Sequence, residues 1–320
     1  MAASLDIIIV NWNTGNQLRD CLNSIYLTEK SGLHIDRIVV VDNASSDGSA
    51  DGLDATPLPV SVIRNQENAG FAVACNQGAA GSNGDYILFL NPDTKLFQES
   101  LVKPIAFMER AENDRVGICG IQLVDDEGNV ARNCARFPTP ALVASSMIGL
   151  DIVLPHWFPS HFMKEWDHGE TRDVDQVMGA FFLVRRKVLE DLGRFDERFF
   201  VYYEDVDFAF RAHRIGWRSL YLCEAQAFHK GGGSSEQVKA KRVFYLLRSR
   251  ILYGYKHFGS LAGTGLLLET FLFEFAARLA WHAAHLSWSE FEATLEGYAR
   301  LSVAMPEILK RRLLRIGTDR

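Results

Sequence analysis

The sequence predicts an α/β protein whose central sheet is parallel and doubly wound. Three mostly apolar runs, Leu5–Val10, Arg37–Val41 and Ile87–Leu90, each end abruptly in polar, turn-forming residues. Stretches with helical spacing separate the strands, and this alternation is typical of parallel sheets covered by helices. Open sheets of this class bind ligands outside the carboxyl ends of their strands. The polar residues at those ends therefore predict a ligand-binding crevice.

The remaining elements are expected from their own patterns. Apolar residues recur at helical spacing in Gln17–Leu27, and Phe71–Ala80 reads as a helix of small residues that packs closely on a sheet. The other expected helices are Leu101–Ala111, Arg186–Gly193 and a segment from about Asp205; the other expected strands are Val60–Arg64, Val116–Val124, Val174–Val184 and Trp217–Cys223. The segment 137–166 is rich in prolines and aromatic residues and shows no regular pattern. We interpret this segment either as a long mobile loop or as a packed connector.

Composition narrows the class of protein. The chain has 320 residues, of which 48% are apolar and 23% charged, as in ordinary globular proteins. A net charge of −6 argues against nucleic-acid binding, which needs a basic face. Five cysteines without a CxxC pair favour a reducing compartment, and the N-terminus shows no export signal. Since no unbroken apolar run reaches the roughly 20 residues of a bilayer span, we expect a cytoplasmic protein.

Four groups of polar residues are candidates for chemistry. They are Asp42 after the second strand, Asn91-Pro92-Asp93 after the fourth, the acidic run Glu204–Asp207, and His229 before the glycines Gly231, Gly232 and Gly233. Taken singly, an aspartate at a strand end is a common turn-former, and acidic residues are common in the first turn of a helix. No G-x-G-x-x-G follows the first strand, so bound phosphates would need another positive partner, which a cation on Asp93 would supply.

Together and in this order, these motifs resemble the family 2 glycosyltransferases, the inverting enzymes of the GT-A fold. The match is strongest to the bacterial rhamnosyl- and galactofuranosyltransferase branch and covers about Leu5 to Gly233. The matching stretches are Ile7–Asn13, Val39–Ser49, Asn68–Gly78, Phe89–Thr94, Gly179–Arg186, Phe195–Phe200 and Tyr203–Arg211. The resemblance implies a GT-A, Rossmann-like mixed sheet flanked by helices, with a C-terminal helical extension. It further implies a catalytic domain over 1–235, with a donor half to residue 95 and an acceptor half from 96, followed by a helical region over 236–320.

The resemblance also assigns the residues that bind the nucleotide-sugar donor. In the family, the matching positions line the nucleobase pocket, bond the base or ribose, and shape the diphosphate side. In this sequence those positions are Val10, Asn11 and Trp12 for the nucleobase, Asp42 for the base or ribose, and Asn68, Gly70 and Asn76 for the diphosphate. A carboxylate such as Asp42 can accept hydrogen bonds from N–H and hydroxyl donors of the nucleoside.

A divalent cation is the cofactor that the resemblance implies. Asn91-Pro92-Asp93 stands where most GT-A enzymes have Asp-x-Asp, so Asp93 is the expected ligand and Asn91 a donor-site residue with an amide in place of the first carboxylate. His229 is the second expected ligand. A hard, oxygen-rich site suits Mg²⁺ or Mn²⁺, and an imidazole ligand favours Mn²⁺.

On the acceptor side, Asp205 resembles the general base of the family. An inverting transfer needs one carboxylate to take the proton of the acceptor hydroxyl as it attacks the anomeric carbon. Glu204 is expected either to bind acceptor hydroxyls or to orient the base, while Gly179 and Ala180 would let acceptor or sugar approach the sheet. We expect Asp207 to lie outside the site, at the helix start.

Rhamnose transfer from dTDP-rhamnose to a saccharide or lipid-linked saccharide, in cell-surface polysaccharide synthesis, is the function that the branch implies. Transfer from UDP-galactofuranose or another UDP-sugar is the alternative within the class. A nucleotidyltransferase would show a Gly-rich basic loop after the first strand, which this chain lacks. An inactive scaffold is the non-enzymatic alternative, and the presence of Asp42, Asp93 and Asp205 argues against it.

The C-terminal part, Phe258–Trp288, is strongly apolar, and basic residues precede and follow it. Those basic residues are Lys239, Lys241, Arg242, Arg248, Arg250 and Lys256 before it, and Lys310, Arg311, Arg312 and Arg315 after it. Two interpretations stay open. The segment packs as a helical subdomain or homo-oligomer interface, or it lies on the inner membrane surface as a peripheral contact.

Overall fold

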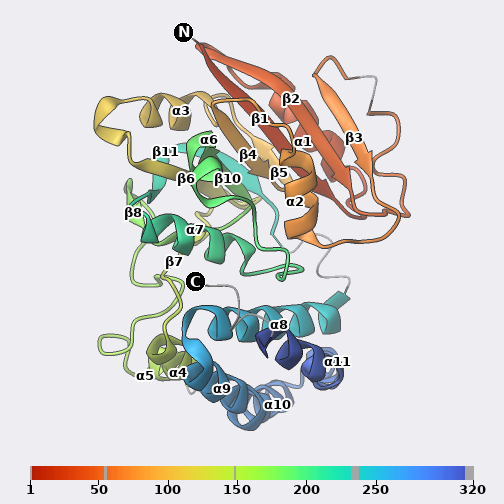
Figure 1. The fold of residues 1–320 in the computed structure, drawn as a ribbon, viewed down its shortest axis with the longest axis vertical. Coiled ribbons are helices and arrows are strands. Elements are labelled where there is room, and N and C mark those ends of the chain that lie inside the picture. Colours follow the sequence, from red (N-terminus) through yellow and green to blue (C-terminus); the bar gives the residue numbers. More distant parts are fainter. Residues whose placement is uncertain (1, 54–55, 148, 232–237, 314–320) are drawn as a thin grey trace. The chain divides into compact units, whose positions relative to one another are not determined.

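The computed structural model describes residues 2–53, 56–147, 149–231 and 238–313, without the side chains of 311–313 (Figure 1). The expectations for Gly232, Gly233 and Arg315 lie outside this part of the chain. The chain divides into two compact units. The first holds the described residues of Met1–Phe137, Phe162–Phe200 and Glu204–Ser234, and the second those of Pro138–His161, Val201–Tyr203 and Ser235–Arg320.

A mixed sheet forms the centre of the first unit, with strands in the order β3-β2-β1-β4-β10-β6-β11-β5 and β8 beside β11. These strands are β1 (Ala3–Asn11), β2 (Leu33–Asp42), β3 (Val60–Arg64), β4 (Tyr86–Leu90), β5 (Thr94–Leu96), β6 (Val116–Val124), β8 (Arg172–Val174), β10 (Phe181–Arg185) and β11 (Arg218–His229). β3, β2, β1 and β4 are parallel, as the alternation predicts. β10 is antiparallel to β4 and β6, so a wholly parallel sheet is wrong and the mixed sheet implied by the resemblance is confirmed.

Helices cover both faces of this sheet, which explains why its central strands are apolar without alternation. Ile7 and Ile9 of β1 pack in one buried cluster with α1 (Gln17–Leu27) and α3 (Val102–Met108). Ile8 and Val10 face the opposite cluster, with α2 (Phe71–Ala79), α6 (Arg186–Leu192) and α7 (Glu204–Arg214) (Figure 1). The helix of small residues packs closely as predicted: a Cβ on Gly78 of α2 would lie 2.4 Å from Ile8 Cγ2.

Two expectations about single elements are wrong. Val174–Val184 is not one strand, because Gln176–Val177 (β9) pairs with Cys134–Ala135 (β7) in a separate small sheet, and β10 starts only at Phe181. Between them, residues 178–180 turn their backbone groups to other partners. The segment 137–166, expected as a loop, contains α4 (Pro140–Met147) and α5 (Leu150–Val153). Pro140 is the first residue of α4, a position that proline tolerates because its missing N–H would have no partner within the helix.

The second unit is helical. After α4 and α5 it holds α8 (Lys239–His257), α9 (Gly259–Glu269), the π-helical turn η4 (Thr270–Glu274), α10 (Phe275–Ala284) and α11 (Trp288–Leu313). α9 packs on α8, and α10 on α11. The run from Gly259 to Ala284 is 26 residues long and contains an 18-residue window of mean hydropathy 1.3, so by length and composition alone this described helical run could cross a membrane, contrary to the sequence expectation.

Candidate active site

The candidate site forms at the carboxyl edge of β2, β1 and β4. The register pairs Asn11, the last residue of β1, with Asp42, the last residue of β2. Ile9 of β1 lies opposite Leu90, where β4 ends, so residues 91–93 extend past the same edge. Polar groups from three neighbouring parallel strands therefore meet where this class of sheet binds its ligands.

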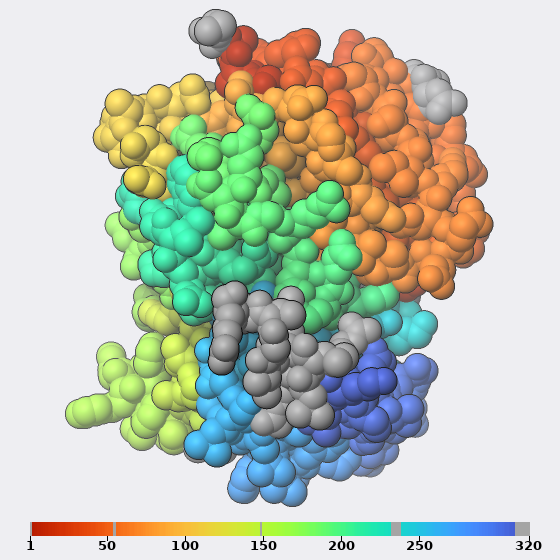
Figure 2. Space-filling model, in the orientation of Figure 1, coloured from red at the N-terminus to blue at the C-terminus, as the bar shows by residue number. Residues whose placement is uncertain are grey.

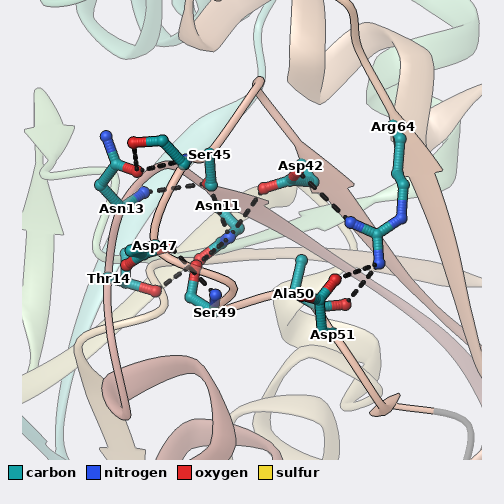
Figure 3. Close-up of polar contacts among 11 residues, drawn as sticks. Asn11, Asn13, Thr14, Asp42, Ser45, Asp47, Ser49, Ala50, Asp51 and Arg64 are labelled. Atoms are coloured by element: carbon teal, nitrogen blue, oxygen red, sulfur yellow. Dashed lines mark hydrogen bonds and ion pairs between the residues drawn. The ribbon is translucent and has the colours of Figure 1, made fainter.

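Asn11 holds this edge together from a fully buried position (Figure 3). Its side-chain amide nitrogen donates to Asp42 Oδ1 at 2.9 Å, Ser49 Oγ at 2.8 Å and Ser45 Oγ at 3.1 Å. Its side-chain oxygen accepts from Thr14 Oγ1 at 2.5 Å. Because both polar atoms of the amide are engaged, the structure gives Asn11 the task of orienting Asp42 and the loop after β2.

Arg64 lies on the other side of Asp42, a contact that sequence reasoning missed. The register places the last residue of β3, Arg64, opposite Asp42, and its Nη1 is 3.8 Å from Asp42 Oδ2 (Figure 3). Nη2 of Arg64 is fixed by Ala50 O at 2.9 Å and Asp51 Oδ1 at 3.0 Å. A half-exposed guanidinium thus stands beside a carboxylate that is only 4% exposed. Val10 packs in the core, and Trp12 is half-buried.

The loop before α2 is tied to the same edge by amide side chains. Asn43 donates to Gly70 O at 3.2 Å and accepts from Asn65 Nδ2 at 2.8 Å, while Asn68 Oδ1 accepts from Gly70 N at 3.0 Å. Gly70 has a φ of 94°, and a Cβ added there would lie 2.6 Å from Phe200 O. Gly70 is thus required so that the 195–200 turn can approach the start of α2.

We expect Gly70→Ala to lower the free energy of unfolding by about 1 to 3 kcal/mol, because alanine is strained at positive φ and its methyl group would collide with Phe200. Gly81 has a φ of 69° and nothing within 4 Å of an added Cβ, so Gly81→Ala carries the dihedral strain alone. Denaturant unfolding of both variants measures the difference. Equal losses would show that the contact with Phe200 costs nothing.

Asn76 of α2 is bound to the turn at 195–197. Its amide nitrogen donates to Phe195 O at 3.0 Å and Glu197 Oε1 at 2.9 Å, and its oxygen accepts from Phe195 N at 3.0 Å. The side chain is 4% exposed. Asn76 therefore anchors the 195–197 turn on α2, and its polar atoms are not free to contact a diphosphate.

Asp93 and His229 lie side by side although 135 residues separate them. β5 runs antiparallel to β11, with Thr94 opposite His229, and this register brings His229 Nε2 to 3.3 Å from Asp93 Oδ1. Both side chains are mostly buried, at 10% and 19% exposure. Within the described ranges no three His, Cys, Asp or Glu side chains gather as a metal site. A cation here would take two protein ligands, and its other ligands would be water or substrate oxygens.

The segment between β9 and β10 connects this edge with α7. Ala180 O accepts from Asn91 N at 3.0 Å and from Thr94 Oγ1 at 3.4 Å. The neighbouring Gly179 N donates to Asp205 Oδ2 at 3.0 Å. Two hydrogen bonds and one peptide link therefore join the turn that carries Asp93 to the first turn of α7. The structure brings the predicted donor and acceptor sides together at this point.

Asp205 is held by backbone N–H groups on both oxygens. Besides Gly179, Val206 N donates to its Oδ1 at 2.8 Å. Burial raises the pKa of Asp205 above the ordinary 3.8, and these N–H groups act in the opposite direction without cancelling the effect of burial. The carboxylate is thus fixed in direction and is a stronger base than an exposed aspartate.

Glu204 precedes Asp205 but is only 6% exposed, and its Oε2 has no hydrogen-bond partner among the described residues. Burial, and next the charge of Asp205, raise the pKa of Glu204 well above its usual range. Its burial favours orientation of Asp205 over contact with acceptor hydroxyls. Asp207 is fully buried and pairs with Arg211 Nε at 2.8 Å, a contact within α7.

Solved structures of low sequence identity share this fold. A Pyrobaculum calidifontis mannosyltransferase, solved with GDP-Man and Mn²⁺, is 16% identical with a TM-score of 0.51, over 93% of this chain and 86% of that one. Staphylococcus aureus TarS 1–349, solved with UDP-GlcNAc, is 15% identical with a TM-score of 0.52, over 93% and 92%. Both likenesses bear out the GT-A fold, a mixed sheet flanked by helices with a helical C-terminal part.

Sequence relatives are closer. The chain is 26% identical over 259 residues to the N-acetylglucosaminyl-diphospho-decaprenol L-rhamnosyltransferase of Mycobacterium tuberculosis, covering 76% of this chain and 81% of the relative. It is 27% identical to rhamnosyltransferase WbbL of Escherichia coli K12, covering 54% and 62%. The family model described as glycosyl transferase family 2 matches residues 6–193, which is more than half of the chain. The chain therefore belongs to glycosyl transferase family 2.

Proposed function

We propose that this glycosyltransferase is an inverting, cation-dependent rhamnosyltransferase. It would move L-rhamnose from dTDP-rhamnose to a lipid-linked saccharide at the cytoplasmic side of the membrane. The observation that carries the reaction type is the hydrogen-bonded path from the Asp93 turn through Ala180 and Gly179 to Asp205. This path supports the proposal because it connects the carboxylate that would bind the cation with Asp205, the proposed base in the first turn of α7.

In this reaction Asp205 takes the proton of the acceptor hydroxyl. The hydroxyl oxygen then forms a bond to the anomeric carbon on the face opposite the leaving group, and the bond from that carbon to the diphosphate oxygen breaks. The nucleotide diphosphate leaves with the bonding electron pair. Gly179 N–H and Val206 N–H keep the carboxylate of Asp205 pointed in one direction during the transfer.

The residues at the edge fit a divalent cation. Asp93 offers a carboxylate and His229 an imidazole nitrogen 3.3 Å away, both mostly buried, a donor set suited to Mn²⁺ or Mg²⁺. Bound there with the diphosphate, the cation would neutralise charge that develops on the leaving group. Asp42, oriented by Asn11, would accept hydrogen bonds from the base or ribose.

The names of the sequence relatives support the donor and acceptor class. Both are rhamnosyltransferases, and the mycobacterial relative is named for a decaprenol-linked acceptor. All five cysteines are free, which agrees with a reducing, cytoplasmic compartment. UDP-galactofuranose is the alternative donor that the sequence motifs leave open.

A thermal-shift screen of UDP, dTDP and GDP, with and without Mn²⁺, tests both the class and the donor. A ligand that binds only the folded protein must raise its apparent stability. We expect a shift with dTDP that depends on Mn²⁺. A UDP-selective shift would replace rhamnose by a UDP-sugar, and no shift with any nucleotide would favour the inactive scaffold.

A further inference from the structure

The exposed residues of α9, η4 and α10 include no ionisable side chain, and Glu269, Arg278 and His282 are half-buried. Its exposed large side chains are Leu261, Leu268, Leu272, Phe273 and Trp281, and the other exposed residues between 261 and 284 are glycine or alanine. We call these five side chains the apolar face. Figure 2 shows this part of the chain, in blue, at the surface of the second unit. A soluble monomer rarely leaves such a patch open, so the apolar face is expected to have a partner.

Glu274 and Arg278 of this segment form an ion network with Arg250 of α8, while Glu269 is half-buried. Glu274, at 6% exposure, forms an ion pair with Arg250 of α8 and accepts from Arg278 Nε at 2.9 Å. Arg250 Nη2 also donates to Thr270 Oγ1 at 3.1 Å, and Tyr298 OH donates to Thr270 O at 3.1 Å. Burial alone would raise the pKa of Glu274, but Arg250 and Arg278 hold it below its usual value.

This ion network decides between crossing a membrane and lying on one. If 259–284 spanned a bilayer, Glu274 would leave Arg250 on α8 and carry its charge toward the hydrocarbon core. Separating a buried ion pair, and placing a charge in a membrane, are both strongly unfavourable. If the ion network stays intact, the apolar face remains exposed on the outside of the helical unit. The helical segment is therefore built to insert shallowly, parallel to a surface.

Charge and aromatic content identify that surface as a lipid bilayer. Residues 236–320 carry 13 Lys and Arg against 8 Asp and Glu, although the whole chain has a net charge of −6. A basic excess around an apolar helix favours anionic lipid. Trp281 and Trp288 are 62% and 59% exposed, and tryptophan prefers the membrane–water interface.

We propose that the apolar face docks this enzyme on an anionic membrane as an interfacial, non-spanning contact. Exposed Ile152, Val153 and Trp157 follow α4, which packs against α9 and η4, and they extend the apolar surface of the same unit. This docking adds a membrane location to the proposed function. It rests on that function only in assuming a lipid-linked acceptor. The enzyme and an acceptor anchored in the same bilayer would then encounter each other by diffusion in the plane of the membrane.

Vesicle flotation of the full chain tests the docking without using enzymatic activity. We compare phosphatidylcholine vesicles with vesicles of phosphatidylcholine and phosphatidylglycerol. The wild type is expected to float with the anionic vesicles and to be released by alkaline carbonate. The double variant Leu272→Ser, Phe273→Ser is expected to bind at least about tenfold more weakly, since each buried apolar side chain contributes about that factor.

A matched control is the double variant Leu295→Ser, Val303→Ser on α11. These side chains are 42% and 83% exposed, and their neighbours Glu296 and Arg300 make a polar surface. The control should bind vesicles like the wild type. Quenching of wild-type tryptophan fluorescence by brominated lipids provides a reading that needs no variant. Thermal shifts with nucleotides should stay the same in every variant, so failure of docking is distinguishable from failure of the proposed transferase activity.

Three outcomes would overturn the docking. Wild-type protein that floats with neither vesicle has no membrane contact. Protein that resists carbonate extraction spans the bilayer. A wild-type dimer that becomes monomeric in the Leu272→Ser, Phe273→Ser variant, without any vesicle binding, makes the apolar face a subunit interface.

Discussion

Asp205→Asn is expected to lower kcat for sugar transfer by about 100- to 10,000-fold, the range that general bases contribute, and to leave nucleotide diphosphate binding unchanged. The amide keeps the shape of the side chain, although its single oxygen can accept from only one of the two N–H groups, Gly179 N and Val206 N, which lie 3.0 and 2.8 Å from the carboxylate oxygens. It cannot take a proton. Initial-rate kinetics with the nucleotide sugar chosen by the thermal-shift screen measure the first effect, and the thermal shift itself measures the second.

Asp191→Asn is the matched control, because Asp191 is another helical carboxylate of the first unit, paired at 2.9 Å with Lys187. It should retain wild-type kcat. Equal loss of transfer and of nucleotide binding in Asp205→Asn would mean that Asp205 holds the donor. Full activity would remove it from the chemistry.

The pH profile gives a second reading of the same base. Burial raises the pKa of Asp205 above 3.8, and the base works only when deprotonated. The rate should therefore fall as the pH drops through this raised pKa, at a higher pH than an ordinary aspartate would give. In Asp205→Asn the residual rate should lose this acidic limb.

Much of the fold was predictable because the deciding patterns are local. Continuous apolar runs bounded by polar turns predict the parallel strands β1, β2 and β4, and the order of motifs assigns the family. What could not be predicted depends on register between strands. Arg64 faces Asp42 because β3 pairs with β2 in one particular alignment, and no feature of the sequence around Arg64 reveals that alignment.

Contacts made by backbone groups could not be predicted from the sequence either. The partner that orients Asp205 is the N–H of Gly179, and the contact that joins the two sides of the site is Ala180 O with Asn91 N. Neither leaves a side-chain signal, since every residue except proline offers the same N–H and C=O. The run Val174–Val184 predicts one strand for the same reason: its apolar pattern continues where its backbone leaves the ladder to make these contacts.

Asp93→Ala is expected to weaken Mn²⁺-dependent binding of the nucleotide diphosphate by at least about 10- to 100-fold. Mutation of a residue that only supports a metal ligand already causes a loss of this size. The substitution removes the carboxylate whose Oδ1 lies 3.3 Å from His229 Nε2. Isothermal titration of the nucleotide with and without Mn²⁺ measures the effect. Binding without Mn²⁺ should be the same in variant and wild type. An unchanged titration in the presence of Mn²⁺ would take Asp93 out of the cation site.

Asn91→Asp tests the same site by gain of affinity. The described residues give the Asn91 side chain no hydrogen-bond partner, and its backbone N–H is already fixed on Ala180 O at 3.0 Å, so the substitution adds a carboxylate without disturbing an anchor. A further charged oxygen ligand should tighten Mn²⁺ about tenfold, or about 1.4 kcal/mol. Asn23→Asp, on the exposed side of α1, adds the same charge elsewhere and should change nothing. If both variants tighten Mn²⁺ equally, the cation responds to net charge, and the 91–93 turn does not hold it.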